Sequence, residues 1–387
     1  MRDDWLNSLV RLAIGIAYAK YGKEEEAEAA FRDCAERLSF CGDSYGVVIC
    51  QLWLSFLAYR NKQWETFVPA VTQALSLMQS GEYHFLLQRP TIFTPQDVQQ
   101  LMPILLEAQR RQVSPDYVSQ LLNDLGLQNV AFHPGYTLRI QTLGQFRVWL
   151  GERNLGEKAW QRGSAKQLFQ LLVTKRQQLL AREEIMNTLW PDSDEESAIR
   201  DFKVAHNALN KALEPDRAAR SLPFFIQRHG SSYGLNLASG YHIDAEDFEK
   251  LVTLGLAEKE PSQAAVLLEK GLGYYQGEYL PECRYEDWCV DERERLQVLF
   301  LRGAERLAKI GLQQNQLENT IRWCEAILRV DDCWEEAYRL LMTAYFQQNN
   351  RTQAMRWYDK CVAKLREQLG VQPMPATVDT FRQIKGE

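Results

Sequence analysis

A repeat with an offset of 34 residues, late in the chain, limits the fold more than any other feature. At this offset Leu307 superposes on Leu341, the triplet QQN at 313–315 on 347–349, and the pair RW at 322–323 on 356–357. Such a period is typical of helix pairs that cannot bury their apolar faces alone and must stack on neighbouring pairs. Residues 241–387 are therefore predicted to form an array of helical hairpins.

The first third of the chain shows a looser helical pattern. Leu9, Leu12, Ala13 and Ile16 are spaced as one face of a helix. Two helix pairs follow each other up to Met78 with a period of roughly 40 residues, and prolines then break the chain into shorter helices. We expect residues 1–135 to form an N-terminal helical repeat region.

The middle segment, residues 136–240, has a different order of elements. Alternating apolar and polar residues at 138–150 indicate short strands, and two helical stretches follow at 164–174 and 182–189. The acidic run 192–196 opens a longer helix that ends near Leu213, and residues 224–237 fit two strands joined by a Gly/Ser turn. Strands, three helices and a ribbon in this order predict a winged helix.

The predicted fold class is thus mainly α. Helical, tetratricopeptide-like repeat domains are expected on either side of an α+β winged helix-turn-helix domain. The charge distribution supports a separate role for the middle segment, because residues 136–240 hold 15 Lys and Arg against 11 Asp and Glu, whereas the whole chain has a net charge of −6. A single basic segment in an acidic protein is typical of a surface that meets a phosphate backbone.

The third helix of the middle segment is the candidate recognition helix. At 100° per residue its outward sector holds the following five residues: Arg200, Lys203, Val204, Asn207 and Lys211. Arg pairs with guanine, Asn with adenine, and an aliphatic group contacts the thymine methyl. The alternative is an ordinary solvated helix face. His206 lies at the edge of the apolar sector and is expected to pack in the core.

In the predicted ribbon, Arg228 precedes the turn at Gly230. An arginine at a ribbon tip can contact phosphates or a narrow minor groove. Its alternative is an unengaged surface position. The candidate DNA-binding residues are therefore the five on the helix and Arg228.

Other classes of function find no support in the sequence. It contains no GxxxxGK[ST] loop, HExxH or GxSxG motif, so no catalytic residue, enzyme activity or cofactor is predicted. The eight cysteines form no CxxC pair, so no metal site is predicted. No apolar run reaches the roughly 18 residues of a membrane span. The acidic start Asp3-Asp4 does not fit a signal peptide. A cytoplasmic protein without a membrane partner is expected.

Several motifs, taken together, resemble a known family. They are LGQF at 143–146, LWPD at 189–192, the helix 198–213, YQGEYLP at 275–281, DW at 287–288, DERERL at 291–296, LM at 341–342 and LREQLGVQP at 365–373. The first three resemble the OmpR-type winged helix of the Streptomyces antibiotic regulatory proteins, and the others resemble that family's bacterial transcriptional activator domain. The N-terminal third is loosely similar to the helical repeats of maltose-activator-type regulators.

This resemblance implies a transcriptional activator that binds double-stranded DNA at repeated promoter sites, self-associates there and recruits RNA polymerase. Maltose-activator-type regulators have an ATP-binding signalling module ahead of their repeats. This chain is either a short regulator or the C-terminal portion of a longer one, with a signalling module or protein partner at its N-terminal repeats. Recognition helices of the family often show Arg-Asn-Asn where this chain has Ile199-Arg200-Asp201, which implies a different operator.

Two other functions compete with sequence-specific DNA binding. One is a helical-repeat scaffold whose winged helix docks protein rather than DNA. The other is binding of a small ligand in the concave surface of the repeats, and this function is compatible with DNA binding.

Overall fold

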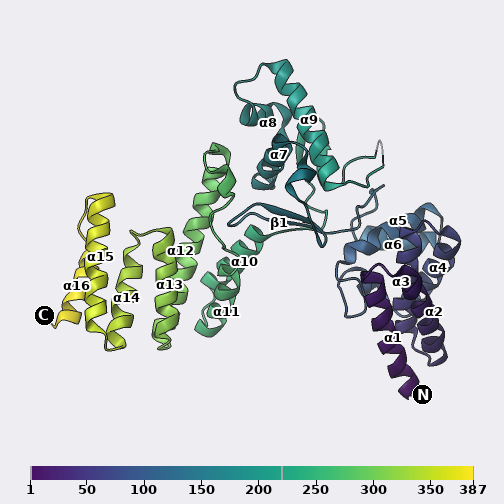
Figure 1. Ribbon diagram of the computed structural model, residues 1–387, viewed down its shortest axis with the longest axis horizontal. Coiled ribbons are helices and arrows are strands. Elements are labelled where there is room, and N and C mark those ends of the chain that lie inside the picture. Colours follow the sequence, from purple (N-terminus) through teal and green to yellow (C-terminus); the bar gives the residue numbers. More distant parts are fainter. Residues whose placement is uncertain (1, 219–220, 387) are drawn as a thin grey trace. The chain divides into compact units, whose positions relative to one another are not determined.

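The computed structural model describes residues 2–218 and 221–386. They form two compact units, residues 1–139 with 149–241 and residues 140–148 with 242–387. Helices dominate both units, and strands are confined to the middle of the sequence (Figure 1). The predicted fold class, helical repeats around a winged helix, is confirmed. Within the described ranges, every helix is too short or too polar to span a membrane.

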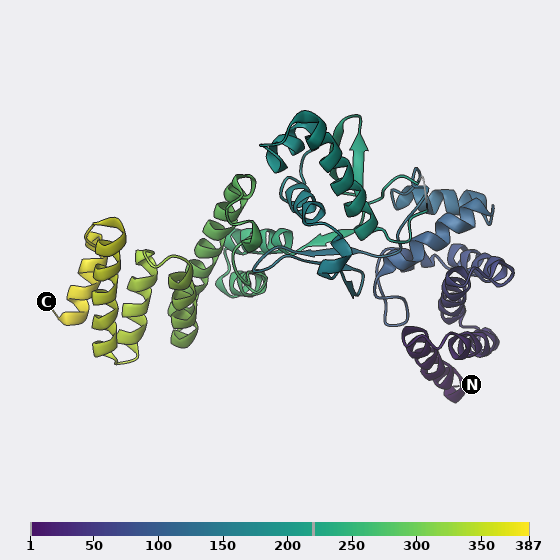
Figure 2. The same cartoon turned by 45° about the horizontal axis from the view of Figure 1, so that its top comes forward.

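The N-terminal helices of the first unit form two antiparallel pairs and an irregular continuation (Figure 2). The elements are α1 (Arg2–Lys20), α2 (Glu24–Phe40), α3 (Ser44–Arg60), α4 (Trp64–Ser80), η1 (Tyr83–Leu87), η2 (Val98–Leu101), α5 (Met102–Arg110) and α6 (Pro115–Asp124). Helix α3 is buried along most of its length, since α2 and α4 flank it and α5 contacts it as well. Its Trp53 stacks on Phe31 of α2 with ring centroids 5.7 Å apart.

The predicted inner face of the first helix is partly wrong. Leu12 and Ile16 are buried, Leu9 is half-buried, and Ala13 is exposed. Because α1 has apolar residues on two sides, the spacing of such residues could not identify the side that packs against α2.

The first unit also contains the helices and ribbon of the predicted winged helix. They are β3 (Arg153–Asn154), η3 (Glu157–Trp160), α7 (Gly163–Thr174), β4 (Leu180–Ala181), α8 (Arg182–Leu189), α9 (Glu195–Leu213), β5 (Ile226–His229) and β6 (Ser232–Leu235). Strands β4, β6 and β5 form an antiparallel sheet in that order, with Arg228 opposite Tyr233. Helix α7 packs against α9, so α9 has one buried face.

A second sheet has the order β3-β2-β1-β7. Its other strands are β1 (Leu138–Gln141), β2 (Arg147–Leu150) and β7 (Tyr241–Ile243). The LGQF motif connects β1 to β2 and belongs to the second unit, where Gly144 donates from its backbone N–H to the Glu278 carbonyl at 2.9 Å. Gly144 has a φ of +85°, and a Cβ there would lie 2.8 Å from the Gln276 carbonyl oxygen. Only glycine fits this turn without strain.

The second unit is otherwise an array of helices. The elements are α10 (Asp244–Ala257), α11 (Pro261–Leu272), η4 (Pro281–Cys283), η5 (Asp287–Cys289), α12 (Val290–Gln313), α13 (Leu317–Val330), α14 (Glu335–Gln347), α15 (Arg351–Leu369) and α16 (Pro375–Lys385). Consecutive helices pack side by side from α12 to α16 (Figure 1). Helices α13 and α15 begin 34 residues apart, at Leu317 and Arg351, as the sequence repeat predicts.

Asp244, the first residue of α10, fastens this array to the LGQF turn. Its buried carboxylate accepts hydrogen bonds from the backbone N–H groups of Thr142 and Leu143 at 2.7 and 2.9 Å, and from the Thr142 hydroxyl at 2.7 Å. Burial raises the pKa of Asp244, and these hydrogen bonds oppose that rise because they stabilise the carboxylate. One side chain thus satisfies the polar groups of a turn about 100 residues earlier in the chain.

Candidate nucleic-acid interface

Helix α9 has a defined start and a continuous apolar face. The Asp194 carboxylate caps the helix by accepting from the Ser197 backbone N–H at 3.0 Å, and this hydrogen bonding lowers the pKa of Asp194. Phe202, Leu209 and Leu213 are buried on the inner face. Because this face is fixed by packing, the orientation of the outward side chains is fixed as well.

The outward face holds the predicted residues along one stripe. Arg200, Lys203, Asn207 and Lys211 are exposed, and Val204 is half-buried among them. Within the described ranges, the side chains of Lys203, Asn207 and Lys211 make no hydrogen bond or ion pair. Arg200 donates to the Ser197 hydroxyl at 3.2 Å and lies 4.0 Å from the Asp201 carboxylate, contacts that are weak at the surface. Polar groups that do not bind one another are free to bind an external partner.

The His206 side chain lies on the inner side of α9 and packs in the core, as predicted from the helical wheel. Its ring stacks on Phe202 at 5.7 Å and meets Tyr233 of β6 edge to face at 5.0 Å. Burial lowers the pKa of His206 to about 4, and the positive charge of Arg228 contributes. The ring is therefore neutral near pH 7 and joins α9 to the ribbon by packing.

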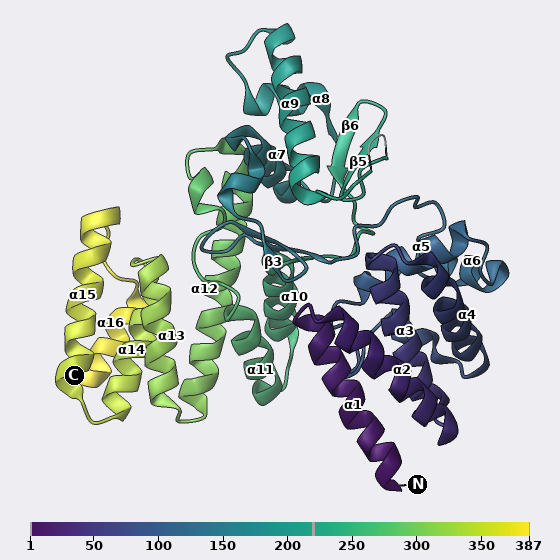
Figure 3. The same cartoon turned by 45° about the vertical axis from the view of Figure 1, so that its right-hand side comes forward.

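Arg228 is an exposed residue of the β5–β6 ribbon, which stands beside α9 (Figure 3). Its Nε donates to the Gly230 carbonyl at 2.8 Å, and its guanidinium lies 5.8 Å from the centre of the Tyr233 ring. Gly230 provides the turn, with a φ of +61°. These contacts hold the arginine near the ribbon tip and leave most of its N–H donors available.

A buried carboxylate at the end of α9 ties the helix to the ribbon. Glu214 accepts from the backbone N–H groups of Phe224 and Phe225 at 2.8 and 2.9 Å and pairs with Arg217 at 3.0 Å. Burial raises the pKa of Glu214. The role of Glu214 is not predictable from the sequence, because its partners lie ten residues further along the chain and only the folded loop brings them together.

Glu196 also belongs to the outward surface of α9 and was not predicted from the sequence. It is exposed and lies one turn before Arg200 on the outward stripe. In the sequence it is one of several acidic residues that suit a helix start. The helical wheel could have separated Glu196 from its acidic neighbours, since four residues place it almost directly in line with Arg200.

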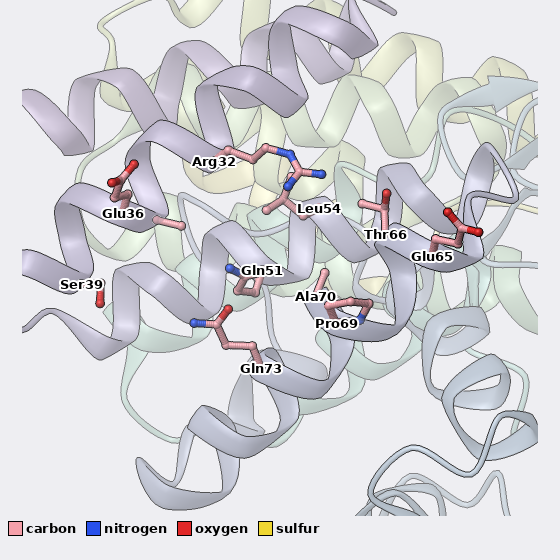
Figure 4. A pocket seen from close by; sticks show the side chains of 11 residues that line it. Arg32, Glu36, Ser39, Gln51, Leu54, Glu65, Thr66, Pro69, Ala70 and Gln73 are labelled. Atoms are coloured by element: carbon pink, nitrogen blue, oxygen red, sulfur yellow. The ribbon is translucent and has the colours of Figure 1, made fainter.

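The N-terminal repeats contain a polar groove between α2, α3 and α4 (Figure 4). It has a volume of about 500 Å³, and Gln51 and Leu54 of α3 form its floor between the rims of α2 and α4. Arg32, Glu36 and Glu65 stand on the two rims. The groove is open and mostly polar, unlike the apolar, enclosed pockets typical of small-molecule sites.

Comparison with known proteins supports part of the resemblance predicted from the sequence. Residues 243–385 match the family described as bacterial transcriptional activator domain. Regulatory protein AfsR of Streptomyces griseus is 25% identical over 252 residues, and transcriptional regulator RedD of Streptomyces coelicolor is 24% identical over 257 residues. The chain is therefore similar to regulators of the Streptomyces antibiotic regulatory type, and its residues 243–385 match the activator-domain family.

The share of each protein that is matched differs between AfsR and RedD. The match with S. griseus AfsR covers 64% of this chain and 24% of AfsR, so the chain spans about a quarter of that protein. The match with RedD covers 62% of this chain and 68% of RedD. The solved structure of Mycobacterium tuberculosis EmbR in complex with a low affinity phosphopeptide is similar in fold, with a TM-score of 0.55 and 18% identity over 64% of this chain and 65% of EmbR.

Proposed function

We propose that this protein is a sequence-specific DNA-binding regulator of transcription, which inserts α9 into the major groove and places the β5–β6 ribbon beside it. The outward stripe of α9 is the observation on which the proposal rests. Its cationic and amide side chains are exposed and unpaired among themselves, while the opposite face is buried. This is the arrangement that a recognition helix requires.

Each residue of the stripe has a chemical role in this proposal. Arg200 pairs with guanine, Asn207 pairs with adenine, and Val204 contacts a thymine methyl group. Lys203 and Lys211 flank this row and bind phosphates, as does Arg228 on the ribbon. Glu196 adds an acceptor for the amino group of cytosine at the start of the helix.

The proposal divides the chain into three functional parts. Residues 136–240 bind DNA, residues 241–387 hold neighbouring copies in register and contact RNA polymerase, and residues 1–135 receive a protein partner or an upstream signalling module. The match of residues 243–385 to the activator domain and the regulatory relatives support an activator.

Selection of bound duplexes from random DNA with the full-length protein tests the proposal. We expect a repeated motif to be enriched, and we expect the double variant R200A/N207A to enrich no motif. The variant K62A, at an exposed position on the loop before α4, serves as the matched control and should enrich the same motif as the unmodified protein. If the unmodified protein enriches no sequence, the proposed function is wrong, and the result favours the alternative in which the winged helix docks protein.

A further inference from the structure

Helix α1 has an exposed apolar stripe on the side opposite to its buried face. The stripe consists of Leu6, Val10, Ala13, Ile14 and Ala17, all of them exposed. The exposed fractions of Leu6, Val10 and Ile14 are 58%, 54% and 45%. At 100° per residue the five positions fall within a sector of roughly 100°, and from Leu6 to Ala17 that sector contains no charged residue.

Helix α16 of the second unit shows what a solvated outer helix face looks like. It has Thr377 and Ile384 on its buried side and exposes Asp379, Arg382 and Lys385. In repeat proteins, a helix face that no other helix covers is normally polar in this way. The outer face of α1 is apolar instead, and a helix that is apolar on two sides is normally buried on both.

We propose that a second copy of this chain covers the outer stripe of α1, with the two α1 helices antiparallel and related by a twofold axis at Val10. The spacing supports self-pairing, because Leu6 and Ile14 lie four residues on either side of Val10. An antiparallel pair therefore places Leu6 of one copy against Ile14 of the other and Val10 against Val10. Such a surface is complementary to itself, as a twofold interface requires.

The helix dipoles favour the antiparallel direction, because the two dipoles oppose each other in an antiparallel pair. Asp4 near the start of α1 and Lys20 in its last turn add to this preference, since the antiparallel pair brings the start of one helix toward the end of the other. A parallel pair would align the two dipoles unfavourably.

The size of the stripe sets the strength of the dimer. One face of a single helix buries less surface than the area of about 800 Å² that each partner buries in a standard stable interface. The dimer is therefore weak in solution, with a dissociation constant in the micromolar range. Two copies bound to adjacent DNA sites have an effective concentration of roughly millimolar, which is sufficient to form it. The self-association does not depend on the proposed DNA binding and can be measured without DNA.

Sedimentation equilibrium of the full-length protein, from low micromolar to submillimolar concentration, tests the proposal. We expect a monomer–dimer equilibrium that V10E and I14E each shift toward monomer by at least tenfold. Both positions are exposed, so these variants should fold. V266E is the matched control, because Val266 on α11 is 67% exposed and lies in the other unit. A monomer at every concentration, or equal effects of V10E and V266E, would overturn the proposal.

Cysteine cross-linking tests the direction of pairing. V10C should form an intermolecular disulfide on mild oxidation, since the two copies of residue 10 face each other. In A17C the two thiols lie about 20 Å apart in an antiparallel pair, given 1.5 Å per residue, and should not link. Mass spectrometry of the linked peptides separates these bonds from those of the eight native cysteines. Equal linking of A17C and V10C would mean parallel pairing and contradict the proposed dimer.

Discussion

Helices α9 and α1 are both fixed by one buried face and both present a continuous stripe on the other. In α9 the stripe consists of Arg200, Lys203 and Asn207 with their neighbours, and in α1 it consists of Leu6, Val10 and Ile14 with two alanines. The backbone geometry is the same in both. The class of partner that we assign to each helix follows from the side chains alone, because charged and amide groups gain from phosphates and bases, whereas apolar groups gain from being removed from water.

The comparison also shows why one helix was easier to interpret from sequence. In α9 the apolar and polar sectors are distinct, so the periodicity identifies the buried face. In α1 both sectors are apolar, and the periodicity is compatible with burial of either sector. Ala13, predicted on the inner face, is exposed for this reason.

The largest effect is expected on the inner face of α9, where acid should weaken packing. The pKa of His206 is about 4 in the folded protein and near 6.5 when unfolded, so the unfolded chain binds more protons between these values. The contribution of His206 to stability is complete above pH 6.5 and is lost as the pH falls toward 4, by about 3 kcal/mol at most. Denaturant unfolding near pH 7 and near pH 5 measures it.

The variant H206F should flatten this pH dependence. His133, whose pKa burial lowers to about 3, retains its own contribution in that variant. H84Q, at an exposed histidine, is the control and should leave the slope unchanged. An identical pH slope in H206F and the unmodified protein would show that His206 does not titrate in this range.

The next effect concerns the outward face of α9. R200A or N207A should each weaken binding to the selected operator by about 1–3 kcal/mol, because a bidentate contact with a base is lost. Binding to random DNA should change much less. Gel-shift titrations on both types of duplex measure the difference. Equal losses on operator and random DNA would show that these side chains contact only phosphates.

The outer stripe of α1 should affect cooperativity without affecting base recognition. V10E should weaken binding to a two-site operator by about tenfold, since the α1 contact between adjacent copies is lost and only the contact through residues 241–387 remains. Its affinity for a single site should be unchanged, whereas R200A weakens both. A V10E protein that loses single-site affinity would indicate that α1 supports the fold of the DNA-binding region instead.

The smallest effect is expected at the ribbon. R228A should lower affinity on all sequences and reduce the slope of log affinity against log salt by about one, the value for one lost phosphate contact. R153A, an exposed arginine on β3, is the matched control. A salt slope that is the same in R228A and in the unmodified protein removes Arg228 from the proposed interface.

Short-range patterns in the sequence determined much of this protein. The 34-residue offset predicted the helical array, the order of elements predicted the winged helix, and the helical wheel identified the exposed side of α9. Each of these depends on residues within one element or one repeat, where periodicity reflects burial directly. Motifs such as LGQF predicted the resemblance to a known family, and Gly144 shows their physical basis, since its turn has no room for a side chain.

Contacts between distant segments were decided only by the tertiary structure. Glu214 binds the backbone before β5, and Asp244 binds Thr142 across 102 residues. Neither partner is recognisable in sequence, because a backbone N–H is the same at every residue and only the fold selects the one that is left without a partner. The exposure of the α1 stripe has the same origin. The sequence determined that α1 is apolar on two sides, and the packing of α2 against one of them decided which side is left for a partner.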